Sequence, residues 1–400
     1  MQVGCRDPLP ALEKMSTKQP KRKVLFVLPS LEGGGAERVF ISLANFFSTD
    51  ESVELHLALM FPSFDFSLPS NVVVHSLTSY RGGKKAVRDV LQVGAVWQLR
   101  KLLKKIDPDV CIGFLLRANL VLLAAASTIG MWKRVLLTEH GYAAAPVKSL
   151  RSRFLLALNL LSYRSAWHTI CVSEGLRGYL IARGVRPDRV ETILNPVDID
   201  EISQHALQAT CPPEMIRIDG RRKILGVGRL AAQKQFNVLI KTVAEVAKSE
   251  PVALYLLGGG PERANLERLA KSLGISELVH FLGFQLFPAA YFAHADVFVL
   301  TSEWEGFGLV VAEALAARCP CVAYDCNFGV GEILGRDYRW LIPNGDENAL
   351  AAGILNALCV SKEELDEVRA RGSQRVTAVH IDLIGPQYRM MIDRIANGRV

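Results

Sequence analysis

The stretch VFVLTSEWEGFGLVVAEALA, residues 297–316, carries the clearest indication of fold in this chain. Its apolar start, Val297 to Leu300, predicts a buried parallel strand that the following polar residues end. Gly306 and Gly308 allow a sharp turn, and the apolar residues from about Leu309 predict a helix. A strand, a glycine loop and a helix in this order direct backbone N–H groups and the positive end of the helix dipole at an anion. The stretch therefore predicts an anion site at the edge of a parallel sheet.

Two carboxylates frame this loop. Glu305 lies within it, and Glu313 follows eight residues later in the expected helix. Carboxylates repel phosphate, but they accept hydrogen bonds from sugar hydroxyls. The layout suits a ligand with phosphates in the middle and hydroxylated rings on either side, which describes a nucleotide sugar.

The segment EGFGLVVAEALA, with the following strand CVAY and the later Glu332-Ile333-Leu334, resembles the E-x7-E signature of retaining glycosyltransferases of family 4. The resemblance implies the GT-B fold, an α/β architecture of two doubly wound Rossmann-like domains facing a cleft. In this layout Glu313 would hold the ribose hydroxyls, and Glu305 would orient the hydroxyls of the donor sugar.

The loop between the two glutamates is expected to hold the donor phosphates. The backbone amides of Gly306, Phe307 and Gly308 would then stabilise the charge of the leaving group, and Leu309, at the start of the expected helix, is a further expected binding residue. Any α/β protein can place a glycine and a glutamate before a helix, so the two glutamates alone would be weak evidence. The match of the whole neighbourhood favours the family.

A second glycine loop follows the first expected strand, VLFVLPS from Val24. The sequence LEGGGAER lacks the G-x-G-x-x-G spacing of dinucleotide-binding proteins. It resembles the first loop of family 4 enzymes, in which residues equivalent to Gly34 and Gly35 lie near the distal phosphate and the sugar of the donor. A plain tight turn is the alternative.

Two cations follow a strand in the second half of the chain, in RKILGVGRLAAQK. Arg229 and Lys234, five residues apart in the loop after the strand, can grip both phosphates of a diphosphate, Arg in a bidentate manner and Lys as a point charge. The arrangement also resembles the diphosphate clamp of family 4. The alternative is that Arg229 and Lys234 only keep the surface of the protein soluble.

Two further residues are expected in the cleft. His140 follows the strand that ends in TEHG, at the edge of the sheet where α/β proteins bind ligands. In the resembling family a histidine at a comparable place contacts the donor sugar, although a lone histidine is more often structural. Phe284 ends the strand Val279 to Phe284, whose equivalent in the family contacts the nucleotide base.

The alternation of strands and helices predicts the domain organisation. We expect a disordered leader over residues 1–21, an acceptor-binding Rossmann-like domain over 22–198, a nucleotide-sugar domain over 199–380 and a C-terminal helix over 381–400 that crosses back to the first domain. Within that last segment we expect the helix to start at Pro386, because Gly385 breaks the pattern before it and proline suits a first helical position.

Charge is distributed unevenly between the two halves of the 400 residues. Residues 1–200 hold 26 Lys and Arg against 17 Asp and Glu, whereas residues 201–400 hold 21 against 23. The basic first half predicts an anionic partner, either a membrane surface or a phosphorylated acceptor; no nucleic-acid motif accompanies the charge. Basic helical stretches contain Lys84, Lys85 and Arg88 and the pair Arg151 and Arg153, and these stretches either lie on a membrane or present an ordinary solvated face.

The location follows from the eight scattered cysteines and from the lack of an apolar run long enough to span a bilayer. We expect a cytoplasmic protein that can lie on the inner face of the cytoplasmic membrane. Asp107 and Asp109 match the D-x-D metal signature of the other glycosyltransferase fold, but their place between a helix and a strand indicates a helix stop. We therefore expect no metal and no cofactor other than the nucleotide-diphosphate sugar as co-substrate.

The resulting hypothesis is a retaining, metal-independent glycosyltransferase that moves a hexose or N-acetylhexosamine from a UDP-linked donor to a lipid-linked or cell-surface saccharide. Family resemblance favours a front-face displacement in which the leaving phosphate assists deprotonation of the acceptor. Two alternatives remain at this stage. One is a nucleotide-sugar epimerase or glycan phosphorylase of the same fold, and the other is a non-catalytic subunit that binds nucleotide sugar during polysaccharide assembly.

Overall fold

The computed structural model describes residues 21–80, 85–141, 150–216 and 220–398, with the side chains of 85–93 and 151–152 excepted. The expected leader therefore lies outside the described residues, except for Lys21. Lys84 and the side chains of Lys85, Arg88 and Arg151 also lie outside them.

The first sheet has seven parallel strands in the described part of the chain, in the order β3-β2-β1-β4-β5-β6-β7. The strands are β1 (Arg22–Leu28), β2 (Val53–Leu59), β3 (Val73–Ser76), β4 (Val110–Phe114), β5 (Val135–Glu139), β6 (His168–Cys171) and β7 (Val190–Thr192). The connecting helices are α1 (Gly35–Ser48), α2 (Lys85–Ile106), α3 (Leu115–Ser127), α4 (Leu150–Ser165) and α5 (Glu174–Ile181).

The second sheet has six parallel strands within the described residues, in the order β10-β9-β8-β11-β12-β13. These are β8 (Arg222–Val227), β9 (Val252–Leu257), β10 (Val279–Gly283), β11 (Val297–Leu300), β12 (Cys321–Asp325) and β13 (Leu341–Pro343). The helices of this half are α6 (Ile199–Gln208), α7 (Phe236–Val246), α8 (Arg263–Ser272), α9 (Ala289–His294), α10 (Leu309–Ala316), α11 (Val330–Leu334), α12 (Glu347–Cys359), α13 (Lys362–Val376) and α14 (Ile381–Ala396).

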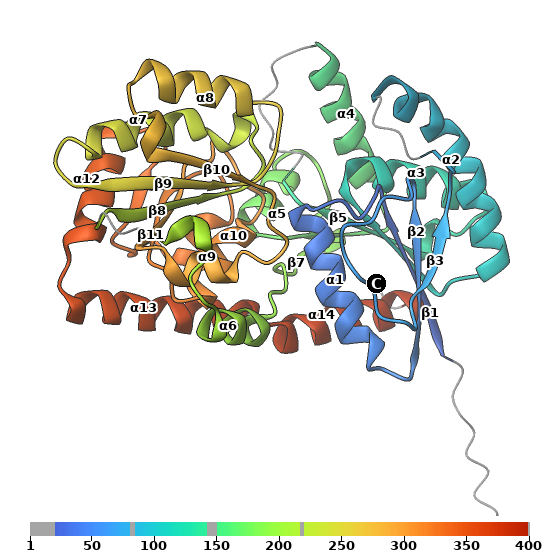
Figure 1. The fold of residues 1–400 in the computed structure, drawn as a ribbon. Coiled ribbons are helices and arrows are strands. Elements are labelled where there is room, and N and C mark those ends of the chain that lie inside the picture. Colours follow the sequence, from blue (N-terminus) through green and yellow to red (C-terminus); the bar gives the residue numbers. More distant parts are fainter. Residues whose placement is uncertain (1–20, 81–84, 142–149, 217–219, 399–400) are drawn as a thin grey trace, which may run out of the picture.

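The two sheets and their helices form two Rossmann-like α/β domains side by side, so the predicted fold class is confirmed (Figure 1). Each sheet order reverses direction next to its first strand, as in doubly wound folds. The central strands carry apolar side chains on both faces because helices cover both faces. In β4 and β11, for example, all residues are buried.

The chain crosses between the two domains at two neighbouring places. The N–H group of Val197 donates to the carbonyl of Val379 at 2.8 Å, and the N–H group of Ile381 donates to the carbonyl of Val197 at 3.1 Å. After the second crossing α14 runs back beneath the first domain, as Figure 1 shows. The two connections therefore form one hydrogen-bonded strip along the hinge side of the molecule.

The prediction that the last helix starts at Pro386 is wrong. The helix α14 begins at Ile381, and the imidazole Nδ1 of His380 accepts the N–H group of Asp382 at 3.1 Å to cap it. Gly385 lies inside the helix because α14 packs closely on α1 there. A methyl group added to Gly385 would lie 2.7 Å from the ring of Phe46. Glycine at this position thus serves a helix–helix contact, and the helix continues through the proline.

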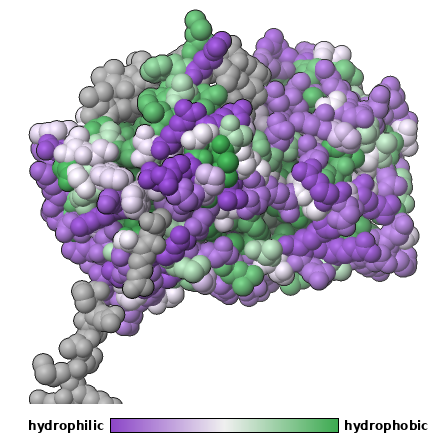
Figure 2. Space-filling model, turned by 180° about the vertical axis from the view of Figure 1, so that it is seen from behind, coloured by the Kyte–Doolittle hydropathy of each residue, from purple (hydrophilic) through white to green (hydrophobic). Residues whose placement is uncertain are grey.

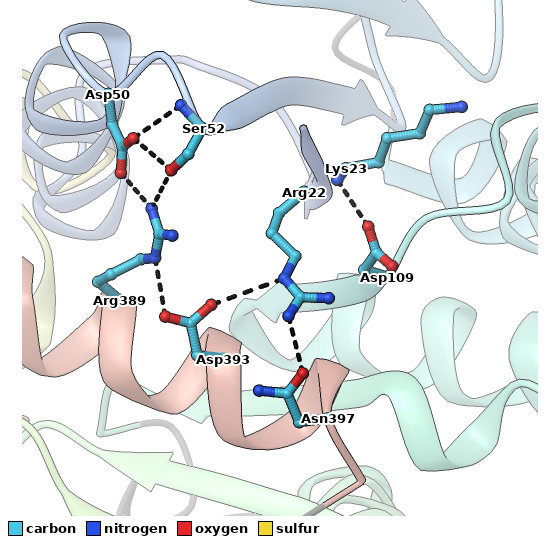
Figure 3. Close-up of polar contacts among 8 residues, drawn as sticks. All are labelled: Arg22, Lys23, Asp50, Ser52, Asp109, Arg389, Asp393 and Asn397. Atoms are coloured by element: carbon cyan, nitrogen blue, oxygen red, sulfur yellow. Dashed lines mark hydrogen bonds and ion pairs between the residues drawn. The ribbon is translucent and has the colours of Figure 1, made fainter. Parts of the chain in front are cut away.

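An ionic network fastens α14 to the amino ends of β1 and β2 in the first sheet (Figure 3). The guanidinium of Arg389 bonds the carboxylate of Asp50, and its Nε donates to Asp393 at 3.0 Å. Arg22, the first residue of β1, donates to Asn397 at 2.7 Å and lies 3.7 Å from Asp393. Segments from both ends of the chain are therefore tied together at this edge.

The interpretation of the D-x-D pair as a helix stop agrees with the structure. The helix α2 ends at Ile106, and Asp107 adopts a left-handed conformation with φ of 49°. The Asp107 carboxylate pairs with Arg134 at 2.7 Å, and Asp109 accepts the N–H group of Lys23 at 2.8 Å. Both carboxylates are thus engaged in joining α2 and β4 to their neighbours.

Within the described ranges, no helix combines the length and the apolar character that crossing a membrane requires. The seven cysteines in the described part of the chain are all free thiols.

Candidate active site

A cavity of about 750 Å³ lies between the two domains, at the carboxyl ends of strands from both sheets. Ligands of α/β proteins bind at this edge, and the volume lies in the usual range for small-molecule sites. All twelve site residues predicted from the sequence line this one cavity: Gly34, Gly35, His140, Arg229, Lys234, Phe284, Glu305, Gly306, Phe307, Gly308, Leu309 and Glu313. The structure thus brings together residues that are up to 279 positions apart (Gly34 to Glu313).

The glycine loop before α10 turns as the sequence predicted. Gly308 is the N-cap residue of α10 and has φ of 91°, a conformation that side chains rarely adopt. Gly306 is required for a different reason: a methyl group there would lie 2.1 Å from the carbonyl oxygen of His140 in the opposite domain. The loop therefore touches the first domain directly while its helix points its N-terminus toward the cavity.

Glu305 and Lys234 form an ion pair on the wall of the second domain. The Nζ of Lys234 lies 2.5 Å from Oε1 of Glu305, and the hydroxyl of Ser302 donates to the same oxygen at 2.6 Å. Both side chains of the pair are largely buried, with 16% and 10% of their surface exposed. Lys234 lies in the turn after β8, so the pair joins the loop after β8 to the loop after β11.

Arg229 lies in the same turn but is exposed, and its guanidinium has no ionic or hydrogen-bonding partner among the described residues. It lines the cavity beside the Lys234–Glu305 pair. Five N–H donors are therefore available to an anion in the cavity without breaking an existing contact.

Glu313 is paired with a residue that sequence reasoning missed. The NH1 group of Arg38, on α1 of the first domain, lies 2.5 Å from Oε1 of Glu313, and its NH2 group donates to the carbonyl of Leu286 at 2.8 Å. The signal in the sequence was the cation at the end of LEGGGAER, one helical turn after the glycine loop. Its partner, 275 positions away, could not be identified from the sequence.

His140 lies at the end of β5, where its imidazole borders the cavity. Burial lowers its pKa to about 3, so the ring is neutral near pH 7. The hydroxyl of Thr138 donates to the carbonyl of Gly113 at 2.8 Å, so it must accept from Nε2 of His140 at 2.9 Å. Nδ1 is then an acceptor, and it has no hydrogen-bond partner among the described residues.

The first glycine loop lines the cavity from the side of the first domain. The N–H group of Gly33 donates to Asp65 at 2.8 Å, and the ring of Phe284 from the second domain packs against Gly33, where a methyl group would come within 2.2 Å of it. Glu37, in the first turn of α1, is a second residue that sequence reasoning missed. Burial raises its pKa to about 7, and its carboxylate folds back over Gly34.

Other residues complete the lining of the cavity. The amide of Gln233 donates to the carbonyl of Trp304 at 2.8 Å, which ties the Arg229 turn to the loop of Glu305. In the described part of the chain, no group of three or more His, Cys, Asp or Glu side chains is arranged to hold a metal ion. The arrangement offers cations and a helix N-terminus for a diphosphate, and carboxylates for hydroxyl groups on both sides of it.

Comparison with known proteins agrees with the geometry. The model of Glycosyltransferase Family 4 matches residues 33–201, and the model of Glycosyl transferases group 1 matches residues 214–375. The first match begins at the glycine loop of α1, and the second contains Arg229, Lys234, Glu305 and Glu313.

Two bacterial relatives match most of the chain. An N-acetylgalactosamine-N,N'-diacetylbacillosaminyl-diphospho-undecaprenol 4-alpha-N-acetylgalactosaminyltransferase of Campylobacter jejuni is 28% identical over 345 residues, which cover 84% of this chain and 90% of that protein. The lipopolysaccharide core biosynthesis glycosyltransferase LpsD of Rhizobium meliloti is 26% identical over 327 residues, or 80% of this chain and 84% of the relative.

Solved structures share the fold at lower identity. HepE of Anabaena, in complex with UDP and glucose, superposes with a TM-score of 0.73 at 20% identity and covers 93% of this chain and 99% of its own. Sucrose-phosphate synthase of Thermosynechococcus elongatus gives a TM-score of 0.78 at 17% identity, with 94% of this chain and 100% of its own covered. With its two matched models and two Rossmann-like domains, the chain is a glycosyltransferase of the GT-B fold that resembles family 4.

Proposed function

We propose that this glycosyltransferase transfers a hexose or N-acetylhexosamine from a UDP-linked donor to a lipid-linked or cell-surface saccharide, with retention of configuration and without a metal ion. The observation that carries the proposal is the convergence of Arg229, Lys234 and the N-terminus of α10 on one interdomain cavity, with Glu305 and Glu313 on either side. A nucleotide-diphosphate sugar has the matching order of groups: hydroxylated ribose, two phosphates and hydroxylated sugar.

The diphosphate would lie between the exposed guanidinium of Arg229 and the backbone amides of Gly306 to Leu309. Lys234 has three N–H donors, of which one is directed at Glu305, so the others can reach a phosphate. These groups would stabilise the negative charge that develops on the leaving diphosphate. Preorganised charges and dipoles of this kind usually contribute more to the rate of an enzyme than any other single effect.

The two ring systems of the donor would be held by different side chains. Oε2 of Glu313 would accept from the ribose hydroxyls, since Oε1 bonds Arg38. Oε2 of Glu305 would accept from the hydroxyls of the transferred sugar, since Oε1 bonds Lys234 and Ser302. His140, whose neutral imidazole lies in the wall of the cavity, would contact the transferred sugar. Phe284 would lie against the base.

The acceptor class rests on the relatives. The Campylobacter enzyme is named for a diphospho-undecaprenol saccharide acceptor, and the Rhizobium enzyme for the lipopolysaccharide core. Lipid-linked acceptors of this kind lie in a membrane, and the first domain offers a surface that fits an anionic one.

That surface is the exposed side of α4, which projects from the first domain (Figure 1) and carries apolar side chains at the top of the view in Figure 2. Leu150, Phe154 and Leu161 are 83%, 67% and 57% exposed, and Arg153 and Arg164 on the same helix are exposed cations. On α2 the exposed ring of Trp97 carries Lys101 above it, with Nζ 3.3 Å from the ring centroid. Exposed apolar side chains flanked by cations are typical of helices that lie on a membrane surface.

Transfer from UDP-, GDP- and ADP-linked hexoses and N-acetylhexosamines to an undecaprenyl-diphosphate-linked N-acetylhexosamine tests the proposal. The acceptor is offered in phosphatidylglycerol and in phosphatidylcholine vesicles, and the anomeric proton of the product is read by NMR. We expect transfer from a UDP-linked donor, an α linkage from the α-linked donor, and faster transfer on the anionic vesicles. A β linkage would refute retention, equal rates on both vesicles would refute the membrane contact, and no transfer from any UDP-linked donor would refute the donor assignment.

A further inference from the structure

Arg38 reaches from the first domain into the nucleoside end of the cavity. It is the fourth residue of α1, and its two terminal nitrogens bond two different groups of the second domain: the carboxylate of Glu313 at 2.5 Å and the backbone carbonyl of Leu286 at 2.8 Å. Its side chain is 24% exposed and that of Glu313 is 9% exposed. The contact is thus a largely buried link between domains.

Both groups bonded by Arg38 belong to the part of the cavity that the proposed function gives to the nucleoside. Glu313 is the proposed ribose residue, and Leu286 lies two residues after Phe284, the proposed base residue. Arg38, Leu309 and Glu313 also line a second cavity of about 320 Å³ on the hinge side, so the ion pair forms part of the wall between the two cavities. A guanidinium in this wall fixes where the nucleoside site ends.

The guanidinium suits this task because it is planar and presents its N–H groups in a fixed fork. One arm of the fork holds Oε1 of Glu313, which leaves Oε2 free to accept hydrogen bonds. The other arm holds the segment after β10 through Leu286. A single side chain therefore sets the spacing between the ribose-binding carboxylate and the base-binding segment.

We propose that Arg38 is a positioning residue for nucleotide recognition: it orients the Glu313 carboxylate and the Leu286 segment, and so makes nucleoside affinity depend on the first domain. This inference rests on the proposed function. It gives Glu313 a fixed orientation, in the same way that Lys234 and Ser302 hold Glu305 within the second domain. The difference is that Arg38 comes from the opposite domain, so the nucleoside site is complete only when the two domains are in contact.

Other contacts hold the domains together without touching the nucleoside site, and they provide a matched control. The carboxylate of Glu332 accepts the N–H groups of Glu174 and Gly175 at 2.9 Å each, at the start of α5. The hydroxyl of Ser173 donates to the carbonyl of Gly306 at 2.9 Å. Glu332→Gln therefore weakens an interdomain contact whose residues line neither of the two cavities.

Calorimetric titrations with UDP and with inorganic pyrophosphate test the inference. The proteins are the wild type, Arg38→Lys, Arg38→Gln, Glu313→Gln, Glu332→Gln and the double variant Arg38→Gln/Glu313→Gln, each checked for an unchanged far-ultraviolet circular dichroism spectrum. Arg38→Lys keeps the charge but not the fork, so it remains informative if the glutamine variant does not fold.

We expect Arg38→Gln to weaken UDP binding about ten- to a hundred-fold, the usual range for hydrogen bonds to charged groups. The UDP affinity of Arg38→Lys should lie between that of Arg38→Gln and that of the wild type. Both Arg38 variants should bind pyrophosphate within twofold of the wild type. The double variant should bind UDP at most twofold more weakly than the single variant with the lower UDP affinity. The reason is that Arg38→Gln and Glu313→Gln remove the same interaction, the Arg38–Glu313 pair. Glu332→Gln should leave UDP binding within twofold.

UDP binding within twofold of the wild type in both Arg38 variants would overturn the inference. Equal weakening of UDP and pyrophosphate binding would do the same, as would fully additive losses of UDP affinity in the double variant. Weakening by Glu332→Gln as large as that by Arg38→Gln would also overturn it, because domain contact alone would then explain the effect. Failure of the proposed function looks different, since the wild type itself would then bind neither UDP nor pyrophosphate.

Discussion

The Nζ of Lys234 lies 2.5 Å from Oε1 of Glu305, so two groups expected to hold different parts of the donor are already bonded to each other. The ion pair keeps the carboxylate oriented next to the cavity and leaves its second oxygen free. It also means that the two diphosphate cations are not equivalent. Arg229 is exposed and free of ionic partners within the described residues, whereas Lys234 supports a largely buried carboxylate.

Replacing Arg229 by alanine should impair turnover without affecting stability. Loss of one preorganised charge that stabilises the leaving group costs roughly 2–4 kcal/mol of transition-state stabilisation. Because Arg229 has no partner to lose in the described part of the protein, the melting temperature should not change. Steady-state kinetics measures the turnover and scanning calorimetry the melting temperature. The control is Lys241→Ala, which replaces an exposed cation on α7. Near-normal turnover of the Arg229 variant would remove it from the diphosphate site.

Replacing Lys234 by alanine should impair both turnover and stability. The change leaves Glu305 largely buried without its cation, and breaking a buried pair in this way costs about 3–5 kcal/mol in general. Since Lys234 is 16% exposed, we expect the lower end of that range. Denaturant unfolding measures the loss directly. A Lys234 variant as stable as the wild type would show that the pair with Glu305 is not maintained in solution.

The two glutamates should differ in which ligand they affect. Glu313→Gln should weaken the UDP-sugar and free UDP by similar factors of about ten to a hundred, the range for a hydrogen bond to a charged group. Glu305→Gln should leave free UDP binding nearly intact and reduce turnover of the complete donor. Calorimetry with both ligands on both variants decides the matter. Equal weakening of free UDP by the two changes would refute the division of roles.

Much of this organisation could be predicted from the sequence because it is local. The strand expected at Val297–Leu300 has those bounds in the structure, since it is an apolar run with clear ends, and the strand expected at Val279 to Phe284 ends one residue earlier, at Gly283. All twelve candidate site residues line one cavity, because the carboxyl ends of parallel strands meet at one edge.

The features that could not be predicted depend on tertiary contacts. Glycine disfavours a helix, so the sequence predicts a break at Gly385; the contact with Phe46 that requires glycine there involves a residue 339 positions away. The helix α13 is mostly polar and buries Val368 and Val376, but the surface on which these side chains pack is not evident from its sequence. The pairs Lys234–Glu305 and Arg38–Glu313 link loops and domains that only the folded chain brings together.

Activity should not depend on a divalent metal ion. The cations Arg229 and Lys234 and the N-terminus of α10 can neutralise the diphosphate by themselves, and Asp107 and Asp109 are engaged elsewhere. Donor turnover should therefore persist in excess EDTA. Complete loss of turnover in EDTA, with recovery on addition of Mn²⁺ or Mg²⁺, would show that the phosphate site has been misinterpreted.

The stability of the protein should depend on pH through Glu37. Its pKa is raised by burial from 4.5 to about 7, so the folded state binds a proton more tightly than the unfolded chain does. The associated stability is fully present below pH 4.5 and is lost as the pH rises through about 7. At about 1.4 kcal/mol per pH unit, the loss approaches roughly 3.5 kcal/mol.

Glu37→Gln removes this titration. The variant should gain stability relative to the wild type as the pH rises from 4.5 to 8, and denaturant unfolding at several pH values between these limits measures the difference. Glu245→Gln, at an exposed position on α7, is the matched control and should show no such trend. A constant difference between Glu37→Gln and the wild type would mean that the carboxyl is not protonated in the folded protein near pH 6.

Calorimetric binding of UDP-, GDP- and ADP-linked sugars to the wild type, Arg229→Ala and Glu313→Gln in the presence of EDTA decides whether the interdomain cavity is a nucleotide-sugar site. We expect one site for a UDP-linked sugar, with binding weakened about tenfold or more by each substitution, because Arg229 would bond the diphosphate and Glu313 the ribose of the same ligand. Absence of binding by every donor, or affinities in both variants equal to that of the wild type, would contradict the assignment of the cavity to a nucleotide sugar.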